Sequence, residues 1–196
     1  MDATPFQKSF QEINRLSIRL LDSLSALTAL SELEQVMDDE VQLLDNVLHI
    51  LLQNQDVERC SIYLVEENRL VNYVGASWSD GVYNDLVKKP DKDKRPTTTF
   101  KMGEGLIGVA ADSGEIQNCK NCSEDERYVK KDGTVKAGDG SLVCVPMISN
   151  AKVLGVLCAY HPKPDHFNYE HERFFLAFSR FIAQTLSNVR HMSTLE

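Results

Sequence analysis

One stretch of the chain constrains its fold more than any other. Residues 101–160 hold a glycine-rich turn, a short apolar run and, beyond a polar loop, two apolar strands. The turn stands in KMGEGLIGVAADSG, where we expect a short helix to begin, and the strands are SLVCVPMIS and KVLGVLCAY. A short helix followed by a hairpin predicts an α+β protein with helices packed on an antiparallel sheet.

The other segments extend this pattern. RCSIYLV and LVNYVGA form a predicted hairpin, and apolar residues from 33 to 52 mark one face of a helix that begins at the capping box of Ser31 and Glu34. Residues 175–189 repeat the helical spacing. We therefore expect the order helix, helix, β, β, connecting segment, short helix, β, loop, β, β, helix.

A narrow apolar seam marks the first thirty residues. It advances in alternating steps of four and three, as in a coiled coil, and only Ser17 departs from the apolar pattern. Its positions are Phe6, Phe10, Ile13, Ser17, Leu20, Leu24 and Leu27. We expect residues 1–30 to form a helix that pairs with a second copy of the chain, and residues 31–192 to form the globular domain. The alternative is that this helix packs on its own domain. Both arrangements can occur at once, at different ends of the helix.

Composition excludes several classes of partner. A net charge of -8 without a clustered basic face disfavours nucleic acid. No apolar window reaches the roughly 18 residues that cross a bilayer, and the first residues lack the features of a secretion signal, so we expect a cytoplasmic protein without membrane contact. The five cysteines favour reduced thiols, three of them within apolar runs.

The motifs that could carry chemistry are weak. Gly103, Gly105 and Gly108 form GxGxxG, but the βαβ unit of a dinucleotide fold is missing. Cys119 and Cys122 form one C-x-x-C, which lacks the second pair of a zinc site but leaves a thiol switch open. Three histidines near residue 166 follow no helical spacing, and no nucleophile motif is present. We predict neither a catalytic residue nor a metal site.

Residues 31–190 resemble the GAF domain, a small-molecule sensing module of signalling proteins, through FKMGEGLIGVAADSGEIQN and SLVCVPMISNAKVLGVLCAY. The resemblance implies a profilin- or PAS-like antiparallel sheet of five or six strands flanked by helices. It also implies a ligand pocket under a lid, here Cys119–Gly140, although a plain surface loop is an equal alternative. The residues expected to line the pocket are Ser61, Trp78, Leu106, Ile107, Tyr128, Asp132, Ser141 and Cys144.

Some of these positions match the cyclic-nucleotide-binding members of the family. In those members, a polar residue of the first strand faces the ligand, and the resemblance implies that Ser61 takes this role here. Residues of the glycine-rich turn touch the base, and Leu106 and Ile107 stand at the matching positions. A tyrosine and an aspartate four residues later lie in the lid, and Tyr128 and Asp132 repeat that spacing.

Other positions depart from the pattern of those members. The acidic and aromatic ligand contacts are replaced, which disfavours a cyclic nucleotide because a purine edge would stay unpaired. None of the cysteines precedes a histidine, as in bilin-binding members, and the turn lacks the cysteine of the methionine sulfoxide reductases of this fold. The residues that depart from the pattern of the cyclic-nucleotide-binding members are Gly75, Ala76, Cys158, His161, Pro162, Phe167, His171 and Glu172.

The expected function is that of a non-catalytic sensor domain. It would bind a small ligand of unknown identity, form a homodimer through its terminal helices and serve as the input of a bacterial-type signalling protein, such as a diguanylate cyclase, phosphodiesterase or histidine kinase, with an output domain in cis. No cofactor is assigned. The alternatives are a dimerisation and relay module with an empty pocket, and a thiol redox sensor that uses Cys119 and Cys122.

Overall fold

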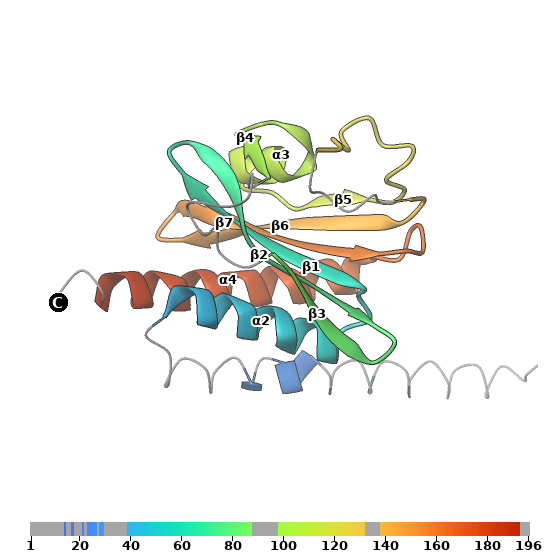
Figure 1. Cartoon of the computed structure of the whole chain (residues 1–196), viewed down its shortest axis with the longest axis horizontal. Helices are drawn as coiled ribbons and strands as arrows, with labels where there is room; N and C mark the ends of the chain where they lie inside the picture. The colour runs from blue at the N-terminus through green and yellow to red at the C-terminus, as the bar shows by residue number, and fades with distance from the viewer. Residues whose placement is uncertain are drawn as a thin grey trace, which may run out of the picture.

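The computed structural model describes residues 14, 17, 21, 23–26, 28–29, 39–87, 98–131 and 138–192 (Figure 1). Its elements follow the order expected from the sequence, with two additional strands after the first hairpin. They are α2 (Glu40–Asn54), β1 (Arg59–Glu66), β2 (Arg69–Ser79), β3 (Val82–Val87), β4 (Thr99–Lys101), α3 (Gly105–Ser113), β5 (Gln117–Cys119), β6 (Ser141–Ser149), β7 (Lys152–His161) and α4 (Tyr169–Met192).

The strands of the described residues form one antiparallel sheet. Its order is β3-β2-β1-β7-β6-β5, and β4 pairs with the start of β2 on the edge away from β1. The α+β class is confirmed, but the sheet has seven strands instead of the five or six expected. The difference lies in β3 and β4, which fall in the predicted connecting segment. Because β3 is an edge strand with four of its six residues exposed, it carries no apolar alternation that would mark it.

Three two-residue turns fix the register of the sheet. Glu67 and Asn68 join β1 to β2, Asp80 and Gly81 join β2 to β3, and Asn150–Ala151 joins β6 to β7. Both residues of every turn have positive φ, the backbone of the type I′ turn whose twist matches that of the strands it connects.

The sheet separates two apolar layers. Helices α2 and α4 cover one face, and α3 lies on the other (Figure 1). Phe175 and Phe178 of α4 are fully buried in the first layer, and Arg190 near the end of α4 pairs with Glu40 at the start of α2, with N···O 2.6 Å. The predicted start of α2 at Ser31 lies outside the described residues.

The first thirty residues are described at nine positions, all helical. Two are seam positions, Ser17 and Leu24, and both are exposed. Ala26 is fully buried in the core with α2 and α4, so one side of this segment packs on its own domain. The other five seam positions lie outside the described residues. Within the described part of the chain, no helix has the length and apolar character needed to cross a membrane.

Candidate functional site

Each of the three glycines in the turn before α3 has a structural role. Gly103 and Gly105 have φ of 77° and 63°, in the left-handed region that favours glycine. A side chain on Gly108 would collide with the carbonyl oxygen of Lys101, because the turn folds back onto the first turn of α3. The GxGxxG pattern therefore serves close packing in this chain.

A row of small side chains crosses the sheet beneath α3. Ser61 of β1 lies opposite Gly75 of β2 on one side and opposite Cys158 of β7 on the other, and Cys158 lies opposite Cys144 of β6. Larger residues stand two positions away along the same strands, namely Arg59 and Tyr63 on β1. Because alternate residues share one face of a sheet, this row forms a trough between taller walls.

A cavity of about 270 Å³ occupies this trough. Strands β1, β2, β3, β4, β6 and β7 supply most of its lining, and Ile107 of α3 with Tyr128 and Val129 of the lid complete it. Its lining residues are Arg59, Cys60, Ser61, Tyr63, Asn72, Gly75, Leu86, Val87, Phe100, Ile107, Tyr128, Val129, Leu142, Cys158 and Tyr160.

Polar groups stand at the two ends of the cavity. At one end the Nε of Arg59 donates to Glu58 at 2.8 Å, and its guanidinium lies 4.5 Å from the centre of the Tyr160 ring. At the other end Asn72 lies opposite Tyr63, whose pKa is raised by burial, so this phenol stays neutral. The side chains between them are small or apolar. The cavity is thus apolar along its length and polar at its ends.

The lid is held to the start of α3 by one lysine. The Nζ of Lys131 lies 2.7 Å from Glu104, donates to the carbonyl oxygen of Thr99 at 2.6 Å and sits over the Phe100 ring. This hydrogen-bonded ammonium lowers the pKa of Glu104. These contacts place Tyr128 and Val129 against the cavity.

The structure brings three of the eight predicted pocket residues to the cavity wall, Ser61, Ile107 and Tyr128. Leu106 and Cys144 are buried in the adjoining apolar layer, and the Ser141 hydroxyl donates to the carbonyl oxygen of Lys163 at 2.8 Å. Asp132 lies outside the described residues.

Trp78 lies on the other face of the sheet, where its ring is 6.2 Å from that of His49 on α2. This corrects its expected position. Gly75 faces the cavity and Ala76 packs in the opposite core, so strand alternation carries Trp78 to the side of Ala76. The same rule, applied from Ser61, would have identified Arg59 and Tyr63 as cavity residues, because they lie two positions away on β1.

Four cysteines lie together in the layer next to the cavity. The sulfur atoms of Cys119 and Cys122 are 3.6 Å apart, and those of Cys144 and Cys158 are 3.5 Å apart. The Cys119 thiol donates to Cys122, which raises the pKa of Cys119 and lowers that of Cys122. All four are buried.

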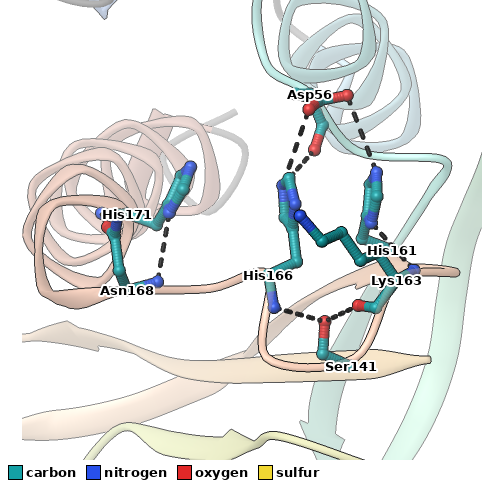
Figure 2. A network of polar contacts seen from close by, with 7 residues as sticks. All are labelled: Asp56, Ser141, His161, Lys163, His166, Asn168 and His171. Carbon is teal, nitrogen blue, oxygen red and sulfur yellow. Dashed lines mark hydrogen bonds and ion pairs between the residues drawn. The ribbon is translucent and has the colours of Figure 1, made fainter. Parts of the chain in front are cut away.

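A second polar cluster joins the end of α2 to the loop before α4 (Figure 2). His161 and His166 stack with ring centres 3.6 Å apart, and their Nε2 atoms lie 3.7 and 3.8 Å from the Asp56 carboxylate. The sequence predicted a solvated loop here and missed Asp56, which comes from a distant segment. Burial and the neighbouring His161 lower the pKa of His166.

The hydrogen bonds of this cluster favour an anchor for the loop over a metal site. The Nδ1 of His161 accepts the Lys163 N–H at 3.0 Å, so the ring proton stands on Nε2, which faces Asp56. A metal-binding histidine normally donates from its second ring nitrogen. His166 instead uses its Nε2 to donate to the Asp56 carbonyl oxygen at 2.9 Å.

Comparison with known proteins identifies the family. The sequence model of the GAF domain family matches residues 39–186. This range includes the whole sheet, the residues that line the cavity and most of α4. The chain belongs to the GAF domain family. A protein described as a probable 3′,5′-cyclic phosphodiesterase, pde-5 of Caenorhabditis elegans, is 24% identical over 137 residues, which are 69% of this chain and 18% of the relative. The chain thus spans less than a fifth of that relative.

Solved structures share the GAF fold at low identity. The GAF domain of a phosphoenolpyruvate-protein phosphotransferase from Coxiella burnetii has a TM-score of 0.68 and 18% identity, covering 88% of this chain and 98% of that one. Free methionine-R-sulfoxide reductase from Neisseria meningitidis, solved with its substrate, has a TM-score of 0.65 and 17% identity, covering 87% and 93%. A GAF domain and a reductase therefore share this fold.

Proposed function

We propose that this GAF domain is a ligand-sensing input of a signalling protein, which binds a small molecule in the cavity between the sheet and α3. The cavity is the observation that carries the proposal, because an apolar hollow with polar groups at its ends is the usual form of a small-molecule site. We further propose that the protein acts in the cytoplasm and that an output domain in cis receives the signal.

The proposal includes a non-catalytic role. The methionine sulfoxide reductases of this fold carry a cysteine in the glycine-rich turn, where this chain has Leu106 and Ile107. Four of the five cysteines lie on β5, β6 and β7 and in the lid and form two close pairs of thiols, and Cys60 lies on β1. This arrangement favours sensing over the chemistry of that enzyme.

Strand β7 provides a physical route from the cavity to α4. Its Cys158 and Tyr160 line the cavity, whereas Leu157 and Ala159 between them pack in the core that contains α4. A second link comes from Asn118 of β5, directly before the lid, whose Nδ2 donates to the Phe167 carbonyl oxygen at 2.9 Å and to the Glu172 carboxylate at 2.7 Å. A ligand that shifts β7 or the lid would therefore change how the first turn of α4 packs.

Hydrogen exchange tests this relay. With a compound selected for binding by thermal shift, we expect slower exchange in the lid and altered exchange in residues 169–189, because a ligand biases two arrangements by about 1–3 kcal/mol in typical coupled systems. A Ser61→Phe variant, which fills the trough, serves as the control and should show neither change. If exchange slowed in the lid alone, the result would support ligand binding but contradict a relay to α4.

Dimer formation belongs to the same proposal. Leu24 is 60% exposed, so its apolar side chain is accessible to a second copy of the chain. Leu24 belongs to the seam predicted from the sequence. We propose that this seam pairs with the same seam of a second copy, so that the domain works as a homodimer.

A thiol redox sensor is the second candidate function, because Cys119 and Cys122 lie 3.6 Å apart with one thiol donating to the other. Hydrogen peroxide would convert the two thiols into one disulfide and release two water molecules. The lowered pKa of Cys122 makes its sulfur the attacking nucleophile and Cys119 its resolving partner.

Differential thiol labelling after peroxide treatment tests this candidate. We expect Cys119 and Cys122 to become protected together and to recover on reduction with dithiothreitol. Cys60, which is buried on the opposite face of the sheet, is the internal control and should stay reduced. Independent oxidation of the two cysteines to sulfonic acid, without a disulfide, would contradict a sensing role.

A further inference from the structure

Three histidine rings stand in a row between the end of β7 and the start of α4 (Figure 2). The ring centres of His161 and His166 are 3.6 Å apart, and those of His166 and His171 are 5.2 Å apart. His161 is the last residue of β7, His171 belongs to α4, and His166 lies in the loop between them, against Asp56 after α2. This histidine row therefore joins three elements at one point.

Two rings of the row accept hydrogen bonds from the backbone. The Nδ1 of His161 accepts the Lys163 N–H at 3.0 Å, and the Nδ1 of His171 accepts the Asn168 N–H at 3.1 Å. An imidazole nitrogen accepts a hydrogen bond only while it carries no proton. A proton on either Nδ1 would make it a donor that faces another N–H. Both hydrogen bonds therefore require neutral rings.

The hydrogen bond of His171 is one half of a capping box at the start of α4. In the other half, the side-chain oxygen of Asn168 accepts the backbone N–H of Glu170 at 3.0 Å and that of His171 at 3.2 Å. The N-terminus of a helix also disfavours a cation, because the helix dipole is positive there. Protonation of His171 would therefore weaken the start of α4.

The surroundings of His166 also oppose a positive charge. Its side chain is 9% exposed and stacks on His161, so one charged ring would lose its hydration and two would repel each other. The Asp56 carboxylate favours a charged ring, but its side chain is 81% exposed and lies 3.8 Å away, so water screens the attraction. The lowered pKa of His166 agrees with this balance.

Other charged groups around the row do not reverse the balance. The Lys163 ammonium disfavours a second cation at His166. Asp165 pairs with Lys120 at 3.2 Å, and the Glu172 carboxylate accepts from Asn118 at 2.7 Å. Glu170 and Glu172 adjoin His171 along α4, and adjacent positions of a helix do not face each other. Among the described residues, Asp56 is the acid that pairs with His161 and His166.

We propose that the histidine row is a proton-sensitive latch, which fastens the β7–α4 loop and the start of α4 while its rings are neutral and releases both when the rings take up protons. The released form binds more protons than the latched form. The latch therefore loses stability as the pH falls below about 6.5, the ordinary value for histidine. It reaches α4 without a ligand in the cavity, so it would give the domain a second input.

Hydrogen exchange of the parent protein measures this release. Exchange in peptides that cover residues 161–171 is compared at about pH 7.5 and about pH 5.5, after correction for the intrinsic effect of pH on the rate. Each proton taken up on release can lower the protection by up to about tenfold per pH unit, and we expect a loss of about three- to tenfold in total. Peptides from β2 should keep their protection.

A triple variant removes the protons but keeps the hydrogen bonds. In His161→Asn the amide oxygen takes the place of Nδ1, and in His166→Gln the amide nitrogen takes the place of the Nε2 donor. His171→Gln supplies the glutamine of an ordinary capping box. Protection in this variant should change by less than about twofold between the two pH values. His191→Asn, at an exposed position near the end of α4, is the matched control and should respond like the parent.

NMR of the imidazole nitrogens tests the geometry without a substitution. We expect His161 and His171 to carry their protons on Nε2 at neutral pH, and the Lys163 and Asn168 amide signals to shift as the rings titrate. A proton on Nδ1 of either ring at neutral pH would contradict the latch.

Two exchange results would also overturn the proposal. One is a parent whose protection in residues 161–171 does not depend on pH, and the other is an equal loss of protection in the parent and the triple variant. If the triple variant does not fold, the three single variants replace it, and each should remove part of the response.

Discussion

Replacing Gly108 with alanine is expected to lower the free energy of unfolding by about 3 kcal/mol, although alanine is the better helix former. The added methyl group would collide with the Lys101 carbonyl oxygen and lie 3.1 Å from two backbone atoms of Gly103. Backbone atoms cannot move aside as a flexible side chain can, so the turn must separate from α3. The gain of about 1 kcal/mol in helix propensity is smaller than this cost.

Urea unfolding followed by circular dichroism measures the effect of Gly108→Ala. The expected change corresponds to a fall of roughly 6–12 °C in melting temperature for a chain of this length. Gly138→Ala is the matched control, because an added Cβ there meets no atom within 4 Å, and it should stay within about 0.5 kcal/mol of the parent. A Gly108→Ala protein as stable as the parent would show that the turn is not closely packed and that its glycines have another purpose.

The second large effect is expected at the N-terminal seam, where Leu24→Glu should convert a dimer into monomers. A glutamate at this position would bring two carboxylates together in the apolar contact between copies, where their desolvation is costly. Sedimentation velocity at micromolar concentration measures the change directly.

Leu21→Glu is the matched control for the seam. Leu21 is as exposed as Leu24, at 63% and 60%, but falls one position outside the predicted a/d register. It should leave the dimer intact. Dissociation by Leu21→Glu alone would place the contact on another face of the helix, and a parent protein that already sediments as a monomer would end the proposal of a dimer.

The sequence was sufficient for the helices and the long strands, because their apolar residues repeat with a clear period. It was insufficient for β3 and β4, where one strand is exposed at the edge and the other has only three residues. Neither carries enough buried residues to show a pattern. The predicted order of elements was therefore correct but incomplete.

The candidate site was less accessible to sequence analysis than the fold. Ser61, Ile107 and Tyr128 reach the cavity as the family resemblance implied, whereas Trp78 does not, because a strand places neighbouring residues on opposite faces. Asn72 looked like an ordinary strand residue. Its place in the cavity wall depends on the pairing of β2 with β1, where Asn72 lies opposite Tyr63.

The pairing of β1 with β7 has a consequence for how the domain folds and unfolds. The two strands come from opposite ends of the domain, so their contact closes a long loop and is expected to form late. The floor of the cavity crosses this same contact, with Ser61 on one strand and Cys158 on the other. If the proposed ligand occupies the cavity, it would hold the two halves of the chain together, and the lifetime of the protein against proteases would depend on the supply of that ligand.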